Sequence, residues 1–224
     1  WIPTLVSVLG LRLGVIIIYG ERGAVETGLY YIAFTIASFI LLIPASVAQI
    51  VFPILSGTEC KHERVTIALR AIKLSTITVV VAVLLMWYFA KVILEVLNPS
   101  YVSAAFVLYI LLLATIPACI IGVVNNLVYA IGKYRMVTAL GLSVSVPRVV
   151  LYLLLTPLMG GTGAAIAFFV GSLSGLVASL IIGRSEKLGT AFYRVALLNV
   201  CSLILVAYFV FYVERKLITL ITVL

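Results

Sequence analysis

One arginine lies in the middle of a stretch that otherwise suits a lipid bilayer. Arg148 occurs in SVSVPRVVLYLLLTP, residues 143–157, and no acidic residue lies within ten positions on either side. Arg12, in SVLGLRLGVII at residues 7–17, has similar surroundings. A guanidinium at membrane depth needs water, an anion or backbone carbonyls as partners. Because arginine matches the geometry of phosphate oxygens, both residues are candidates for a cavity that binds a phosphate-bearing molecule.

The two arginines also have a purely structural interpretation. An arginine at the centre of a spanning helix costs roughly 2.5–3.5 kcal/mol, and each neighbouring Leu, Ile, Phe or Val offsets about 0.3–0.6 kcal/mol of that cost. The apolar neighbours of Arg148 therefore allow its insertion whether or not it binds a ligand. In the structural case, each long side chain packs on carbonyls at helix ends or extends toward the membrane surface.

Three amide side chains are weaker candidates for the same cavity. Gln49 follows Pro44 within one apolar stretch, and Asn125 and Asn126 lie toward the end of another. An amide inside a spanning helix either bonds a neighbouring helix or lines a hydrated cavity. Tyrosines that begin apolar stretches predict an aromatic belt at the membrane interface instead; these are Tyr30, Tyr31 and Tyr101.

Small residues recur at every fourth position late in the chain, which places them on one stripe of a helix. Such a stripe predicts close packing of another helix backbone rather than a binding site. Its members are Gly163, Ala167, Gly171, Gly175 and Ser179, and Gly183 continues the series.

Catalytic and metal-binding patterns are incomplete in this sequence. It has no Asp, and its only His, His62, begins the pattern H-E-x-x-H, whose second His is replaced by Thr66. The segment GSLSG at 171–175 does not match the nucleophile motif G-x-S-x-G of serine hydrolases. The three cysteines lack the spacing of a metal site. We therefore expect no enzyme activity, no cofactor and no metal.

Composition places the chain in a membrane. It is 65% hydrophobic and 10% charged, with a mean hydropathy of +1.33, whereas soluble domains carry about 25% charged residues. Alternating ten-residue segments, which would indicate a β-barrel, are absent. The sequence predicts an all-α bundle of about seven spanning helices, with bends at prolines in the second and fourth. The candidate spans are 1–19, 28–56, 72–94, 101–130, 135–157, 162–183 and 191–213.

Basic residues alternate between the predicted loops. The second, fourth and sixth loops carry nine Lys and Arg, against four in the odd loops and the tail. Because Lys and Arg favour the cytoplasmic side, residue 1 is predicted to be cytoplasmic in a multi-pass protein of the plasma membrane. The net charge of +8 needs only anionic membrane lipid as its partner, and no basic patch with interleaved aromatic residues indicates nucleic acid.

An ordered set of motifs resembles one transporter family. TGLYYIAFTIASFILLIPASVAQIVFPILSG at 27–57 resembles the eighth helix of polysaccharide-exporting flippases. EVLNPSYVSAAFVLYILLLATIPACIIGVVNNLVYAIGKYRMV at 95–137 is similar to their ninth-to-tenth segment. PLMGGTGAAIAFFVGSLSG at 157–175 resembles the start of their twelfth helix. The family is the oligosaccharide/polysaccharide (Wzx-like) branch of the multidrug/oligosaccharidyl-lipid/polysaccharide flippase superfamily.

This resemblance implies two six-helix lobes that face a central cationic cavity. Residues 1–190 would form the second lobe, and 191–224 an extra helix with the start of another. The chain begins and ends inside apolar stretches, so we expect it to be the later part of a longer protein, with the first lobe as a partner. A complete chain numbered from a processed start is the alternative.

The function expected from these observations is translocation of a lipid-linked oligosaccharide or polysaccharide precursor by alternating access. Arg12 and Arg148 would hold its phosphates, and the precursor would serve the cell envelope. Two alternatives stay open. A drug/cation antiporter of the same superfamily would need an acidic residue at membrane depth, and a non-transporting membrane assembly subunit would not need the two arginines.

Overall fold

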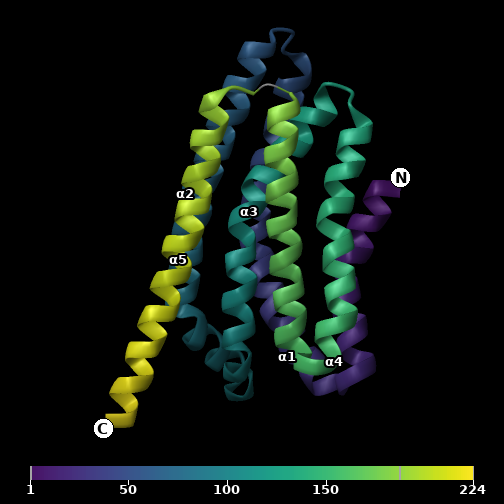
Figure 1. Ribbon diagram of the computed structural model, residues 1–224. Coiled ribbons are helices and arrows are strands. Elements are labelled where there is room, and N and C mark those ends of the chain that lie inside the picture. The colour runs from purple at the N-terminus through teal and green to yellow at the C-terminus, as the bar shows by residue number, and fades with distance from the viewer. Residues whose placement is uncertain (1, 187, 224) are drawn as a thin grey trace.

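The computed structural model describes the backbone of residues 2–186 and 188–223, and the side chains of 13–186, 188–210 and 212. The described residues are helical throughout, apart from short connections, and contain no strand, so the all-α prediction is confirmed (Figure 1). The elements are α1 (Ile2–Gly57), α2 (Lys61–Leu97), the 3-10 helix η1 (Pro99–Ala104), α3 (Ala105–Ala130), α4 (Tyr134–Ser185) and α5 (Thr190–Val223).

All five α-helices are long and apolar enough to cross a membrane. Two of them, α1 with 56 residues and α4 with 52, contain a glycine with non-helical dihedral angles. These glycines are Gly23 (φ 82°, ψ −176°) and Gly160 (φ 57°, ψ −132°). Figure 1 shows the ribbon reversing direction within both helices, so each has two antiparallel halves. The structure thus gives five helices, and seven crossings stay a prediction.

The chain reversals lie at two glycines, whereas the bends predicted at prolines inside the second and fourth spans stay a prediction. Pro44 and Pro53 lie inside the second half of α1, and Pro117 lies inside α3. A proline in a long helix removes one backbone hydrogen bond, and neighbouring helices can compensate for it. A positive φ with an extended ψ, in contrast, is open to glycine and strained for other residues. Gly23 and Gly160 therefore set the reversals of the chain.

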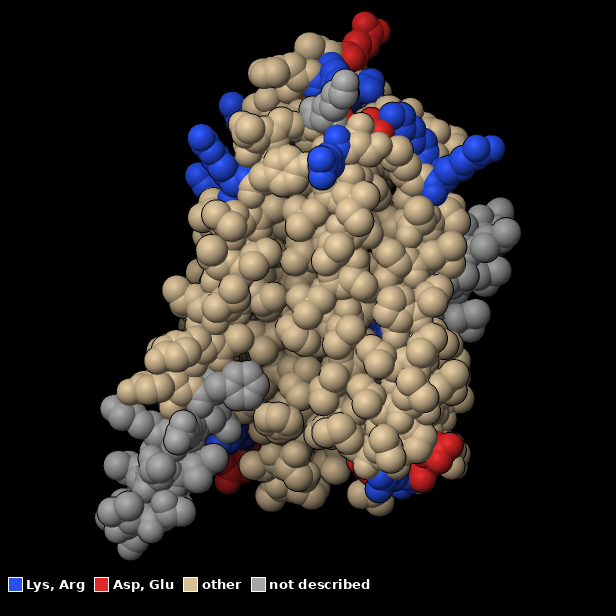
Figure 2. Space-filling model, in the orientation of Figure 1, with Lys and Arg blue, Asp and Glu red and all other residues tan. Residues whose placement is uncertain are grey.

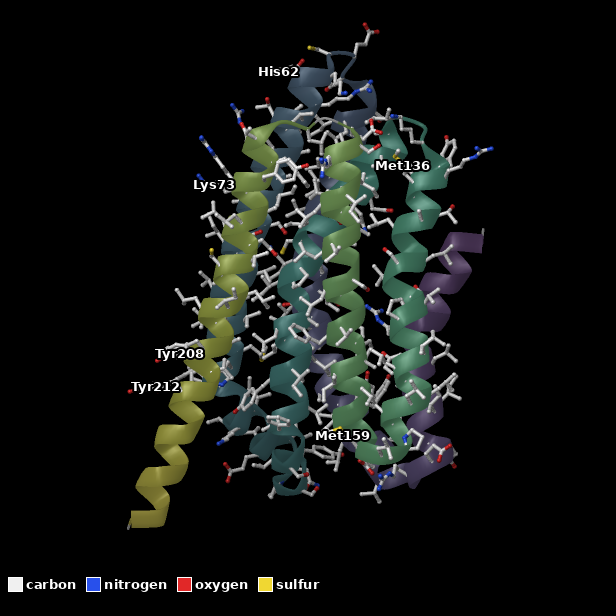
Figure 3. The ribbon with its side chains drawn as sticks, in the orientation of Figure 1. His62, Lys73, Met136, Met159, Tyr208 and Tyr212 are labelled. Atoms are coloured by element: carbon white, nitrogen blue, oxygen red, sulfur yellow. The ribbon has the colours of Figure 1, made fainter. Side chains whose placement is uncertain are left out.

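The connections between helices gather at two ends of the bundle. The connections α1–α2, α3–α4 and α4–α5 lie at one end, and η1 lies at the other with the reversals in α1 and α4 (Figure 1). Blue side chains crowd the first end in Figure 2, and the band between the ends is almost entirely tan. Figure 3 places His62 and Lys73 toward that first end and Met159 near the other. We call them the basic end and the turn end.

Helix α3 forms the centre of the bundle. Eighteen of its residues are buried, including Leu108, Ile116 and Ile120, which are fully enclosed. The outer helices instead keep large apolar side chains exposed, for example Phe39 and Leu85. Because the exposed band is apolar, membrane lipid is its natural partner.

Polar side chains tie the outer helices to α3. Asn199 of α5 is fully buried, and its Nδ2 donates to Thr76 Oγ1 and to the carbonyl of Ile116, both at 3.0 Å. At the basic end, Lys133 donates to both carboxylate oxygens of Glu186 at 2.6 and 2.7 Å. This ion pair links the residues that flank α4 at its two ends.

A reciprocal arrangement of charges fastens the turn end. Arg22 Nη2 donates to the carbonyls of Pro157 and Leu158 at 2.6 and 2.8 Å, where the first half of α4 ends. Glu26 Oε1 accepts a 3.0 Å hydrogen bond from the N–H of Gly161, where the second half begins. Helix ends leave carbonyls and N–H groups unpaired, and these charges match the sign of each helix dipole. One turn of α1 therefore caps both halves of α4.

The capped turn depends on glycine at position 160. Besides its positive φ, a Cβ there would collide with the Glu26 carboxylate. We expect Gly160→Ala to lower the thermal unfolding midpoint in detergent by roughly 4–10 °C, since a strained residue costs about 1–3 kcal/mol. Gly20→Ala is the matched control, because a Cβ at Gly20 would meet nothing within 4 Å. Equal midpoints for the two variants would contradict this account.

Candidate functional site

Arg148 lies inside the bundle, between the two halves of α4. Only 5% of its surface is exposed, and its Cζ lies 4.0 Å from the centre of the Phe168 ring. A cation over an aromatic face at this distance is stabilised by the ring quadrupole. Gly171 makes room for it, because a Cβ there would lie 2.8 Å from Arg148 Cβ and 3.0 Å from its Nε.

Two tyrosines extend this site toward α1. Tyr152, one turn after Arg148, is fully buried. Its ring packs against Gly14 of α1, because a Cβ added at Gly14 would lie 3.0 Å from Tyr152 Cζ. Tyr30 of α1 is also fully buried. It packs against Gly161 of α4, because a Cβ added at Gly161 would lie 3.4 Å from Tyr30 Cβ. Tyr30 of α1 and Tyr152 of α4 therefore belong to the packing around Arg148 and Phe168.

Ring contacts fix the relative positions of these groups. Tyr30 stacks on Phe34 with ring centres 6.0 Å apart, and Phe34 meets the edge of Phe168 at 5.7 Å. Such aromatic pairs contribute about 0.5–1.5 kcal/mol each beyond the area that they bury. We call Arg148, Tyr152, Tyr30, Phe34 and Phe168 the arginine–aromatic cluster.

Several polar atoms of the cluster lack hydrogen-bond partners. Arg148 Nε, Tyr152 Oη and Tyr30 Oη are buried and unpaired, and so is Thr156 Oγ1 one turn beyond Tyr152. The two tyrosine hydroxyls lie near each other, yet they do not meet hydrogen-bond geometry. Residues 148, 152 and 156 share one helix face, since they are spaced by four. The face is a buried polar stripe in an apolar bundle.

No described carboxylate forms an ion pair with Arg148. Glu26 is engaged by the N–H of Gly161 at the turn end, and Glu186 by Lys133 at the basic end. Unpaired buried charge is costly, because transfer of an ion from water into a protein interior carries a penalty of several kcal/mol. Arg148 thus keeps its charge with only a ring face as a partner among the described residues.

The other predicted site residues lie apart from this cluster. The side chain of Arg12 lies outside the described residues. Gln49 is exposed on α1, and Asn125 is half-buried in α3. Asn126 Nδ2 donates to the carbonyl of Ala48 at 2.6 Å. Of the two roles expected for an amide in a spanning helix, Asn126 therefore has the hydrogen bond to a neighbouring helix. The structure thus brings none of the three amides into contact with Arg148.

The small-residue stripe faces the first half of α4. Gly163, Ala167, Gly171, Gly175 and Ser179 are all buried. A Cβ at Gly163 would collide with the Leu155 carbonyl, and one at Gly171 would lie 2.8 Å from the Val144 carbonyl. Ser174 Oγ, beside the stripe, donates to the Ser143 carbonyl at 2.6 Å. Close approach of the two halves is what puts Arg148 against Phe168.

Three polar features of the bundle were missed from the sequence. Tyr30 begins an apolar stretch, which predicts a place in the aromatic belt. That prediction is wrong, because Tyr30 is fully buried, whereas its neighbour Tyr31 is 45% exposed. The buried Asn199 has one sequence signal, since it is the lone amide of its apolar stretch. Tyr152 and Thr156, at one-turn spacing after Arg148, are the signal for the polar stripe.

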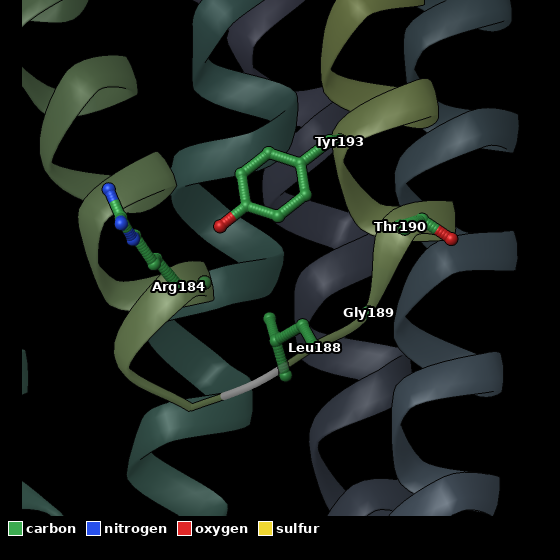
Figure 4. Close-up of a pocket in the computed structure, with 6 residues that line it drawn as sticks. Arg184, Leu188, Gly189, Thr190 and Tyr193 are labelled. Atoms are coloured by element: carbon green, nitrogen blue, oxygen red, sulfur yellow. The ribbon is translucent and has the colours of Figure 1, made fainter.

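An open pocket of about 520 Å³ lies at the basic end, away from the cluster. In Figure 4 the Tyr193 hydroxyl points toward the second half of α4, which carries Arg184, and Thr190 points away. No group of three His, Cys, Asp or Glu among the described residues is arranged to hold a metal. The buried cluster is therefore the stronger candidate site.

Comparisons with known proteins add no identification. No family model, curated protein or solved structure matches the chain. Function must therefore be inferred from the residues themselves.

The contact between Arg148 and Phe168 can be measured with a double-mutant cycle. We expect Arg148→Met and Phe168→Leu to be coupled by about 1–2 kcal/mol in unfolding free energy, because each removes one side of the cation–π contact. Unfolding in mixed detergent micelles is the measurement. The control cycle pairs Arg148→Met with Phe106→Leu, since Phe106 is a half-exposed ring on α3. Equal coupling in both cycles would contradict the contact.

Proposed function

We propose that the protein is a membrane flippase that translocates a lipid-linked oligosaccharide or polysaccharide precursor. The observation that carries the proposal is Arg148, a guanidinium buried in an apolar bundle without a carboxylate partner among the described residues. Ionisable residues at membrane depth mark substrate or ion pathways. A phosphate or diphosphate on a lipid carrier has the charge and the geometry that arginine recognises.

The distribution of acidic residues favours an anionic cargo over a cationic one. Glu26 at the turn end and Glu186 at the basic end are both engaged by other groups, and neither forms an ion pair with Arg148. A drug/cation antiporter would instead need a carboxylate at the depth of Arg148. The unpaired cation is also unexplained if the protein is only an assembly subunit. The flippase is thus the better-supported function.

Topology enters the proposal as an inference from charge. We place the basic end in the cytoplasm and the turn end outside the plasma membrane, following the preference of Lys and Arg for the cytoplasmic side. The two halves of α1 and of α4 would each cross the bilayer, which gives seven crossings with α2, α3 and α5. Residues 1–190 would pair with a first lobe that completes the cavity.

The cluster would respond to alternating access. In this conformation Arg148 is enclosed by Phe168 and Gly171 of the opposite half of α4. Contact with a cargo phosphate therefore requires the two halves of α4 to separate, or α1 to move away from Tyr152. The turn at Gly23 and Gly160 is fastened by Arg22 and Glu26, so we assign the motion to the ends of the helices nearer the basic end.

Charge removal tests the proposal in the native cell. We expect Arg148→Gln, introduced into the gene, to reduce translocation of the lipid-linked precursor at least tenfold, a fall of about 1.4 kcal/mol or more in transition-state stabilisation. The measurements are the precursor retained on the cytoplasmic leaflet and the polysaccharide on the surface, at equal amounts of inserted protein.

The matched control is Arg135→Gln, which removes the same charge near the basic end, where Arg135 is exposed. Its translocation should stay near that of the natural sequence. Normal translocation by Arg148→Gln would contradict the proposal. Loss of inserted protein in Arg148→Gln alone would support the structural interpretation of this arginine instead.

A further inference from the structure

We infer that the arginine–aromatic cluster binds a single small inorganic anion of the halide type. The cluster lies between the halves of α4 and the second half of α1. It contains a buried cation, Arg148, and the buried, unpaired hydroxyls of Tyr152 and Tyr30. The unpaired Thr156 Oγ1 lies about 12 Å farther along α4 and is not counted in the site. Each of the three groups can donate a hydrogen bond, and the guanidinium can only donate. An occupant that only accepts would satisfy them all.

The positive charge of Arg148 favours an anion over a water molecule at this position. A water could accept hydrogen bonds, but it would leave the positive charge of Arg148 uncompensated in a low-dielectric interior. A halide both accepts the hydrogen bonds and neutralises the charge. Glu26 and Glu186 are engaged at the two ends of the bundle, by Gly161 and by Lys133. Since no described carboxylate compensates Arg148, we assign its counter-ion to solution.

Packing limits the size of the occupant. Phe168 covers one face of the guanidinium at 4.0 Å, which leaves a ligand the opposite face and the edges. Gly171 lies against Arg148, and Gly14 lies against the Tyr152 ring, where a Cβ would be 3.2 Å from the hydroxyl oxygen. Backbone and rings thus pack closely around the donors. A monatomic anion needs the least room in such a packed site, whereas an organic phosphate needs the helices to separate.

This inference does not depend on the flippase proposal. It concerns charge balance in the closed conformation, whatever the protein translocates. Translocation in cells and anion binding by purified protein can therefore succeed or fail separately. The same arginine would meet a cargo phosphate only after the halves of α4 have moved apart.

Thermal unfolding of the purified protein in detergent tests anion binding. At constant ionic strength, replacement of gluconate by 100 mM chloride should raise the unfolding midpoint by roughly 3 °C, because a ligand that binds only the folded state stabilises it. Arg148→Met should abolish the shift. Tyr152→Phe, which removes one donor and keeps the ring, should weaken chloride binding severalfold. Equilibrium dialysis with radioactive chloride should give one site per chain.

Arg135→Met is the matched control and should keep the full chloride shift. If Arg148→Met fails to fold, Tyr152→Phe alone decides the matter. A midpoint that is the same in chloride and gluconate would overturn the inference and leave water in the cluster. A chloride shift that persists unchanged in Tyr152→Phe and in any folded Arg148 variant would place the anion elsewhere and overturn it as well.

Discussion

An apolar bilayer offers no hydrogen-bond partner, so every polar group inside the bundle must find one within the protein. Amide N–H groups meet this requirement: Asn126 donates to Ala48, and Asn199 donates to Thr76 and Ile116, although Asn199 Oδ1 has no partner. Arg148 differs from these neutral groups because it carries a charge. Its charge has only the face of Phe168 as a partner among the described residues, and the hydroxyls of Tyr30 and Tyr152 have no hydrogen-bond partner. The demand for an anion follows from this imbalance.

The turn end holds the cluster in register. Glu26 caps the second half of α4 at Gly161, Tyr30 follows one turn later on α1, and Phe34 one turn after that meets Phe168. Glu26 and Tyr30 both contact Gly161, and Phe34 contacts Phe168 farther from the turn on both helices, so the capped turn sets the spacing of the row. Small residues let the two halves of α4 approach closely. The position of Arg148 is therefore a consequence of the glycine turn and the glycine stripe together.

Sequence alone indicates the helical class, the apolar helices and the unusual arginine, because composition, hydropathy and isolated charges are local properties. The gaps between predicted spans, at 19–28 and 157–162, mark the reversals. Hydropathy does not identify Gly23 and Gly160 as the residues at which the chain turns, because a positive φ does not affect hydropathy. The burial of Tyr30 could not be predicted either. It depends on which helix face meets α4, and a tyrosine at the start of an apolar stretch equally suits the membrane interface.

Anomalous scattering from bromide, in crystals of the protein grown with bromide in place of chloride, tests the central claim most directly. Our account predicts one strong anomalous peak beside Arg148 Nε, within about 3.5 Å and on the side of the tyrosine hydroxyls. It predicts no such peak in crystals of Arg148→Met. Density for water alone at that position, or a bromide bound only at the lysines and arginines of the basic end, would contradict the account.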